Sequence, residues 1–238
     1  QINRVASKLN CRAPISLRVN PDVDAQTHPY ISTGLKGNKF GIAYHEVLKT
    51  YREATQLSQI DVVGIDCHIG SQITTTAPYL DALDKVLDLV EQLKKEGIVI
   101  HHLDLGGGLG ISYSDETPPD ITEFTNTLLN RVAERGFGHL DVVLEPGRSL
   151  VGNAGVLLTK VEYLKPGVEK NFCIVDAAMT ELMCPALYEA HHGIVPVQTK
   201  PAKASTYDVV GPVCESGDWL GRDRSLAVEE GDLLAILS

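Results

Sequence analysis

The chain has 238 residues, of which 43% are hydrophobic and 22% are charged, and its formal net charge at pH 7 is −10. This composition is typical of a soluble globular protein with one large domain or two smaller ones. The acidic balance makes nucleic acid or an anionic membrane an unfavourable partner, and no apolar run is long enough to span a bilayer.

Cysteine usage favours a reducing compartment. The five cysteines are widely spaced and include no Cys-x-x-Cys pair, which disfavours a structural zinc site or a disulfide framework and favours a cytoplasmic location. The chain starts with Gln1 rather than Met, and it stops directly after the apolar run 233–237. We therefore expect it to be a segment of a longer protein.

Residues 1–150 alternate between strand-like and helix-like segments. The clearest helix covers residues 79–95, where leucine and valine recur three or four positions apart and Gly97 follows the last turn. Asp120 is the expected N-cap of a helix over residues 121–135. The other expected elements are a helix over 43–57 and strands over 15–20, 60–67, 98–105 and 140–144.

Polar or glycine residues follow each of these strands, namely Asn20, His68, Gly106 and Glu145. They are roughly 40 residues apart, and each interval holds one helix. Such repetition predicts right-handed β–α–β units and a parallel sheet whose strand ends meet at one edge. That edge forms the active face of a (β/α)₈ barrel or the crevice of an open sheet, and four units amount to half a barrel.

After residue 150 the pattern changes to short strands. Prolines and glycines separate them, and the longest helical segment covers only residues 180–190. We therefore expect an all-β domain over 151–238, with strands at 155–163, 171–175, 194–197, 207–210 and 232–237.

Three consecutive glycines, Gly106–Gly108, follow the strand that ends at residue 105. Without Cβ atoms, their N–H groups can turn toward one point and bind a phosphate, although a flexible turn has the same sequence. His68, with Ser71 three positions later, is either a structural histidine or a ring that stacks on a planar cofactor.

Two further places offer chemistry. Glu145 and Arg148 flank Pro146-Gly147; they form a mutual salt bridge, or the carboxylate binds a heterocyclic nitrogen while the guanidinium binds an anion. Cys214 lies in the Gly- and acid-rich loop 214–218, where it is either a small buried apolar residue or an exposed reactive thiol.

In their order along the chain, these motifs resemble those of bacterial diaminopimelate decarboxylases. The segments that carry the resemblance are 20–24, 28–35, 39–41, 67–72, 103–110, 145–148, 185–188 and 211–218. These enzymes belong to the alanine-racemase-like group that depends on pyridoxal 5′-phosphate (PLP). The resemblance implies that residues 1–150 are the C-terminal part of a PLP-binding (β/α)₈ barrel and that 151–238 are an incomplete β-rich C-terminal domain.

The resemblance also implies roles for individual residues. His68 stacks on the pyridine ring, Glu145 pairs with the pyridine nitrogen, and Cys214 donates a proton after CO₂ departs. The cofactor phosphate is surrounded by Ser71, Gly106, Gly107, Gly108, Pro146, Gly147 and Arg148. Substrate is bound by Arg148, Tyr188 and Glu215, in a homodimer in which the Cys214 loop completes the partner's site. No metal is expected.

Two departures from the family pattern leave alternatives open. The lysine that binds the cofactor covalently is missing from this chain, so we expect activity only in a full-length dimer. Cys184 stands where the family usually has an arginine that binds a substrate carboxylate, and a thiol cannot form a bidentate pair. The expected reaction is decarboxylation of meso-diaminopimelate to L-lysine. The alternatives are a related decarboxylase for another basic amino acid or conjugate, and a non-catalytic binding protein.

Overall fold

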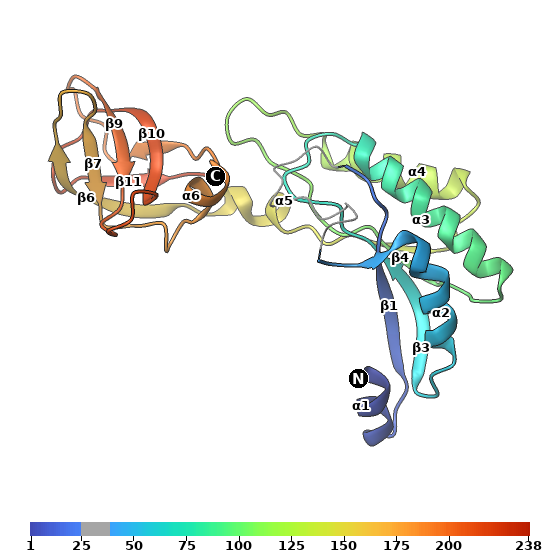
Figure 1. The fold of residues 1–238 in the computed structure, drawn as a ribbon. Helices are drawn as coiled ribbons and strands as arrows, with labels where there is room; N and C mark the ends of the chain where they lie inside the picture. The colour runs from blue at the N-terminus through green and yellow to red at the C-terminus, as the bar shows by residue number, and fades with distance from the viewer. Residues whose placement is uncertain (25–38) are drawn as a thin grey trace. The chain divides into compact units, whose positions relative to one another are not determined.

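The computed structural model describes residues 1–24 and 39–238. The whole of the predicted loop motif at 28–35 therefore lies outside the described residues. The chain divides into two compact units. The first unit comprises Gln1–Gly110 and Thr117–Ser149, and the second comprises Ile111–Glu116 and Leu150–Ser238. Each unit is described by itself below (Figure 1).

The first unit contains a five-stranded sheet in the order β2-β1-β3-β4-β5, and every neighbouring pair is parallel. The predicted parallel sheet is therefore confirmed. Strands β1, β3, β4 and β5 follow one another across the sheet in chain order, and the short edge strand β2 lies on the other side of β1. The strands are β1 (Ala13–Asn20), β2 (Ile42–Ala43), β3 (Ile60–Asp66), β4 (His102–Asp104) and β5 (Asp141–Val143).

Helices link these strands, as the crossovers of a parallel sheet require. Helix α3 begins two residues before the expected position and ends at Lys95 as expected, and Gly97 after it has the left-handed φ of +78° expected of a residue that ends a helix. The Asp120 carboxylate accepts hydrogen bonds from the N–H groups of Thr122 and Glu123, which confirms the predicted N-cap of α4. The helices are α1 (Ile2–Lys8), the 3₁₀ turn Tyr44–Glu46, α2 (Val47–Thr55), α3 (Ala77–Lys95) and α4 (Ile121–Glu134).

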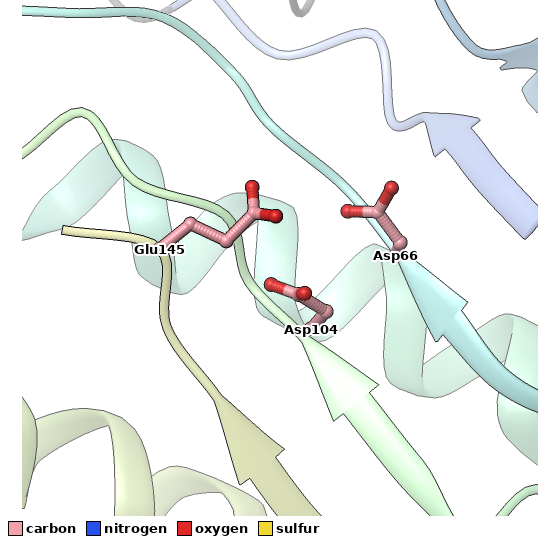
Figure 2. A group of neighbouring side chains, drawn as sticks. All are labelled: Asp66, Asp104 and Glu145. Carbon is pink, nitrogen blue, oxygen red and sulfur yellow. The ribbon is translucent and has the colours of Figure 1, made fainter. Parts of the chain in front are cut away.

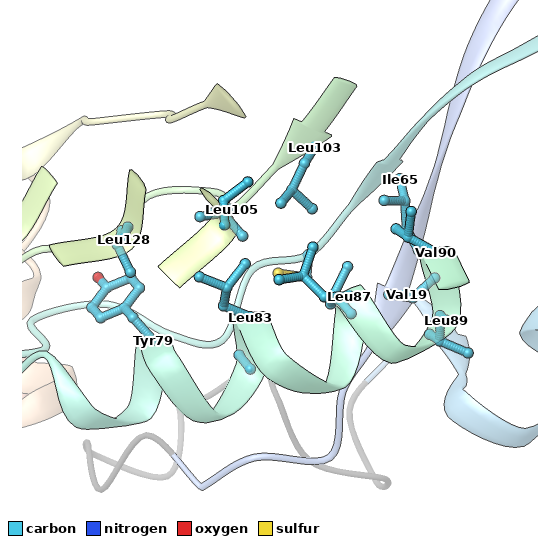
Figure 3. Packing of buried hydrophobic residues seen from close by; sticks show 14 of the residues in the cluster. Val19, Ile65, Tyr79, Leu83, Leu87, Leu89, Val90, Leu103, Leu105 and Leu128 are labelled. Atoms are coloured by element: carbon cyan, nitrogen blue, oxygen red, sulfur yellow. The ribbon is translucent and has the colours of Figure 1, made fainter. Parts of the chain in front are cut away.

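The core of this unit lies between the sheet and α3. Leu83, Leu87 and Leu93 on α3 are fully buried. Figure 3 shows Ile65 and Leu103, from β3 and β4, on the side of the sheet that faces Leu83 and Leu87. Since successive residues of a strand point to opposite faces, the neighbours of these apolar strand residues point away from the helices. The helix-free face therefore carries the polar residues of the sheet.

The register places three of those polar residues in one row across the strands. Arg18 pairs with Asp66, and Asp66 pairs with Asp104. Each lies in the last three residues of its strand. A row of charged side chains therefore crosses the helix-free face close to the carboxyl ends of the strands.

The second unit contains a six-stranded sheet in the order β10-β9-β7-β6-β11-β8, in which only the β7–β9 pair is parallel. Its small helix α6 (Cys184–Tyr188) is shorter than the predicted helix, because Pro185 stands in its first turn and Glu189 leaves it with a left-handed φ of 53°. The strands are β6 (Leu157–Lys165), β7 (Phe172–Val175), β8 (Ile194–Pro196), β9 (Ser205–Val210), β10 (Trp219–Leu226) and β11 (Leu233–Ile236).

Sequence reasoning missed β10, which is one of the two longest strands of this sheet. Its segment is rich in charge and lacks the alternation of a half-buried strand. The pairing with β9 shifts register twice, and Asp223 has a left-handed φ of 54°. Such irregularity is typical of a β-bulge, which breaks the period of two. Within the described residues no helix is long and apolar enough to cross a membrane.

Candidate functional site

The strand ends of the first unit meet at one edge of its sheet, as the sequence predicted. His68 follows β3, the glycines follow β4 and Glu145 follows β5, and these three strands are hydrogen-bonded neighbours. The backbone links them further: the N–H of Glu145 donates to the carbonyl of Gly106 at 2.8 Å, and the N–H of Cys67 donates to the carbonyl of Asp104 at 3.0 Å. Parallel pairing thus brings His68, Gly106–Gly108 and Glu145 together.

We call Gly106–Gly108 the glycine turn. Each of its residues approaches a neighbouring backbone so closely that no side chain fits. A Cβ on Gly106 would lie 2.5 Å from the carbonyl oxygen of Cys67, one on Gly107 would lie 2.1 Å from that of Glu145, and one on Gly108 would lie 2.1 Å from that of Gly70. The glycine turn is therefore a packed crossing point of three strand-end loops rather than a flexible turn.

Two of the three N–H groups of the glycine turn already donate to side chains of the protein. The N–H of Gly106 donates to Asp104 Oδ1 at 2.8 Å, and the N–H of Gly107 donates to His68 Nδ1 at 3.2 Å. Among the described residues the Gly108 N–H has no acceptor, and Gly108 is less buried than the other two. Gly108 is thus the member of the turn that offers an N–H group to an anion.

His68 is a neutral side chain in this setting. Burial lowers its pKa below the ordinary histidine value, the Arg18 guanidinium lowers it further, and Asp104 opposes the shift. A neutral imidazole presents an apolar face, which suits stacking on a planar aromatic group. The arrangement fits a ring-binding histidine better than an acid that exchanges protons near neutral pH.

Three carboxylates gather beside the glycine turn. Asp66, Asp104 and Glu145 each bring an oxygen within 4.8 Å of the others, and Figure 2 shows them at the ends of β3, β4 and β5. Burial, together with the charges of Asp104 and Glu145, raises the pKa of Asp66 to about 6, although Arg18 counteracts this. Such a concentration of negative charge favours a cationic or protonated group between the carboxylates.

Sequence reasoning missed Arg18, Asp66 and Asp104. Arg18 lies 5.3 Å from the centre of the Phe40 ring and donates to the His68 carbonyl at 3.5 Å. The signal that identifies all three is positional: each is the charged residue closest to the carboxyl end of its parallel strand. The sequence prediction considered the residues that follow each strand, whereas these three lie within the last residues of the strands themselves.

A cavity of about 410 Å³ lies beside the end of β1, lined by residues that include Asn20, Tyr44 and Lys85. The Lys85 ammonium, from α3, donates to the carbonyls of Pro21 and Asp22 at 2.9 and 2.7 Å. Asn20 Oδ1 accepts the N–H of Asp22 at 3.0 Å. Lys85 and Asn20 therefore fix the path of the chain where it leaves β1.

The remaining predicted site residues fall into two groups. Ser71, Pro146 and Gly147 lie in the loops after β3 and β5, and Arg148 begins the short helix α5 (Arg148–Val151). Cys184, Tyr188, Cys214 and Glu215 belong to the second unit. Cys184 and Tyr188 are the first and last residues of α6.

The loop that carries Cys214 and Glu215 is exposed but anchored. Both side chains are exposed, and Cys214 is a free thiol like the other four cysteines. Asp218, which is 3% exposed, accepts the N–H groups of Met179 and Val213 at 2.6 and 2.8 Å. Of the two alternatives for Cys214 the structure shows the exposed one, whereas its reactivity stays a prediction. A buried carboxylate holds the loop that presents the thiol.

Comparison with known proteins identifies relatives over the whole chain. The family model described as "Pyridoxal-dependent decarboxylase, pyridoxal binding domain" matches residues 1–152. The diaminopimelate decarboxylase of Vibrio cholerae is 55% identical over 238 residues, and that of Neisseria meningitidis serogroup B is 56% identical. Each match covers 100% of this chain and 57% of the relative, so the chain spans little more than half of these proteins.

Solved structures show the same similarity. The crystal structure of diaminopimelate decarboxylase from Helicobacter pylori complexed with L-lysine superposes with a TM-score of 0.91 at 40% identity, covering 99% of this chain and 58% of that one. A lysine decarboxylase from Selenomonas ruminantium superposes with a TM-score of 0.82 at 23% identity, which shows a shared fold. These relatives are thus diaminopimelate and lysine decarboxylases.

Proposed function

The chain belongs to the pyridoxal-dependent decarboxylase family through its pyridoxal-binding domain, and we propose that the protein containing it decarboxylates meso-diaminopimelate to L-lysine. The observation that carries this proposal is the identity of 55% to a diaminopimelate decarboxylase along the entire chain. The relative solved with L-lysine, at a TM-score of 0.91, supports the same product. Matches of this kind do not favour the alternative substrates.

The residues at the strand ends fit PLP. Close contacts with neighbouring backbones hold the glycine turn in place, and the Gly108 N–H is available for a phosphate oxygen. Glu145 is an exposed carboxylate suited to a protonated pyridine nitrogen. The same proposal assigns the phosphate to Ser71, Pro146, Gly147 and Arg148 in addition to the glycine turn, and the ring face to His68.

When bound, PLP supplies an electron sink for the charge left on carbon after CO₂ departs. Glu145, beside Asp66 and Asp104, would keep the ring nitrogen protonated, because three neighbouring carboxylates disfavour loss of that proton. The neutral His68 ring would cover one face and exclude water. These tasks are binding, orientation and proton retention.

The second unit would supply the groups that act on the substrate. Cys214 would donate a proton to the carbon that has lost CO₂, and Glu215 would bind the distal amino group. Tyr188 and Cys184 of this unit and Arg148 of the first unit are the other proposed substrate-binding residues. We propose that the Cys214 loop acts in the site of a second copy of the protein, so that the active form is a homodimer. Its exposure supports this assignment.

The proposal extends to the fold and location of the whole protein. The five parallel strands with their helices would form part of a (β/α)₈ barrel over 1–150, and 151–238 would form an incomplete β-rich domain. Five free cysteines support a reducing, cytoplasmic setting.

The test uses the full-length protein that carries this chain, reconstituted with PLP. We expect the visible absorbance band of the protein-bound cofactor, and release of CO₂ and L-lysine from meso-diaminopimelate. Glu145→Gln should reduce kcat by about 100-fold, whereas Glu123→Gln, an exposed carboxylate at the start of α4, should leave it unchanged. Binding of PLP without turnover of meso-diaminopimelate would reject the substrate, and absence of PLP binding would reject the cofactor.

A further inference from the structure

We propose that His68 is a positioning residue locked as the Nε2–H tautomer, whose Nδ1 atom holds the glycine turn in place. The inference deepens the proposed function. Only its consequence for cofactor binding rests on that function. The tautomer and the anchoring of the turn concern the protein without any ligand.

The geometry around Gly107 carries the first step. Its N–H points at His68 Nδ1 at 3.2 Å, and a ring nitrogen that accepts a hydrogen bond cannot carry a proton of its own. The single proton of a neutral imidazole must then reside on Nε2. The ring orientation and the tautomer are therefore set by one backbone N–H.

The second step is that Gly107 is held on both sides. Its carbonyl accepts the Tyr79 hydroxyl at 3.1 Å, and both Gly107 and Tyr79 are buried. Side chains from the end of β3 and from α3 thus bind the two polar groups of one residue. Because a buried N–H without a partner is costly, loss of Nδ1 would free the glycine turn to move.

Protonation of His68 would break this arrangement, since an imidazolium donates from both nitrogens and would face the Gly107 N–H. The charged groups that act on the ring come from neighbouring strands: Arg18 on β1 opposes protonation and Asp104 on β4 favours it. Burial also opposes it. His68 should consequently stay neutral at pH values where ordinary histidines are charged.

A division of labour within the glycine turn follows. Asp104 occupies the Gly106 N–H and His68 occupies the Gly107 N–H, so both side chains aim the turn while Gly108 binds the anion. His68 would then contribute to cofactor binding twice, through its ring face and through the turn. The two contributions can be separated by substitution.

Nitrogen NMR of the full-length protein, with labelled histidine and without PLP, tests the tautomer directly. We expect the His68 Nδ1 signal to be that of an unprotonated acceptor and Nε2 that of a protonated nitrogen, with protonation of the ring only below the ordinary histidine pKa. The signal is assigned by its loss in His68→Gln. A proton on Nδ1, or titration at the ordinary value, would overturn the inference whether or not PLP binds.

Three variants separate the acceptor from the ring. His68→Asn keeps an oxygen near the position of Nδ1, whereas His68→Gln places its amide near Nε2 and His68→Phe keeps only a ring. Without PLP, we expect His68→Asn to unfold at nearly the wild-type temperature and the other two several degrees lower. Equal decreases of the unfolding temperature in all three variants would show that the Nδ1 acceptor does not hold the glycine turn.

PLP affinity completes the test. His68→Phe should bind PLP about tenfold more weakly than wild type although it retains an aromatic face, because the turn has lost its anchor. Wild-type affinity in His68→Phe would assign the contribution to stacking alone and contradict the anchoring. If PLP binds none of the proteins while the NMR result holds, the proposed function fails and the tautomer inference stands.

Discussion

The carboxylate of Asp218 accepts the backbone N–H of Val213 at 2.8 Å, one residue before Cys214. Its other oxygen accepts the N–H of Met179 at 2.6 Å, so a single buried side chain ties the Cys214 loop to the segment that leads into α6. A Cβ on Gly211 would lie 2.4 Å from the same carboxylate. The loop that carries the exposed thiol is therefore held by hydrogen bonds to a buried carboxylate.

Asp218→Asn should destabilise the second unit and loosen the Cys214 loop. One amide N–H₂ would face a backbone N–H in place of an acceptor, at a cost of about 2 kcal/mol. Trp219, the only tryptophan, lies in this unit, so its fluorescence during urea unfolding measures the loss. The alkylation rate of Cys214 should change as well. Glu169→Gln, an exposed carboxyl change in the same unit, is the control and should alter neither quantity.

Gly107→Ala should displace Glu145 or prevent the first unit from folding. The new Cβ would lie 2.1 Å from the Glu145 carbonyl oxygen, which is backbone and cannot rotate away. We expect a loss of at least about 3 kcal/mol, measured as the urea midpoint of the helical circular dichroism signal. Gly138→Ala, whose Cβ would meet only Ala133 at 3.5 Å, should cost less than about 0.5 kcal/mol. Similar midpoints for the two variants would contradict the close-packed glycine turn.

Tyr79→Phe should destabilise the first unit by about 1 to 2 kcal/mol, because the buried Gly107 carbonyl loses its donor. The ring remains and keeps its edge-to-face contact with Phe124, whose centre is 4.8 Å away. Tyr44→Phe removes a hydroxyl bonded to the half-buried Lys85 carbonyl, where water can substitute, and should cost less. Thermal unfolding of both variants is the measurement. A larger loss of stability in Tyr44→Phe than in Tyr79→Phe would contradict the role of the Tyr79 hydroxyl.

Asp66 should make the first unit less stable as the pH rises through about 6. Its folded pKa of about 6 exceeds the ordinary aspartate value of 3.8, so its contribution to stability is fully present below the lower value and lost as the pH rises through the higher one. Asp66→Asn should therefore stabilise the cofactor-free protein at pH 7.5 by about 1 kcal/mol, discounted for partial exposure, with little gain at about pH 4. Asp81→Asn on exposed α3 surface should show no such pH dependence.

Periodicity located most of the first unit because its elements obey simple rules. The leucine stripe of α3, the Asp120 cap and Gly97 are local signals, and each corresponds to the structure. In the second unit β10 escaped because a bulge and Asp223 interrupt its alternation. Local patterns could not predict β10, because the segment forms a strand through its pairing with β9 and not through an alternation of its own.

The candidate site was predictable in position but not in its internal bonds. Strand spacing placed His68, the glycine turn and Glu145 at one edge, yet it could not show that Asp104 and His68 occupy two of the turn's N–H groups. The row of Arg18 and Asp66 depends on register, and register follows from the pairing of strands far apart in sequence. The requirement for glycine likewise arises from neighbouring backbones rather than from a ligand.

The order of strands in the two units has a consequence for synthesis on the ribosome. In the first unit β3, β4 and β5 pair with β1, β3 and β4, all of which are made earlier, so the sheet can grow as the chain emerges. In the second unit β11 lies between β6 and β8, and both must wait for Leu233–Ile236 before they can pair with it. A nascent chain that stalls before β11 would keep the first sheet in register, but in the second it would leave one side of β6 and the whole of β8 unpaired and open to aggregation.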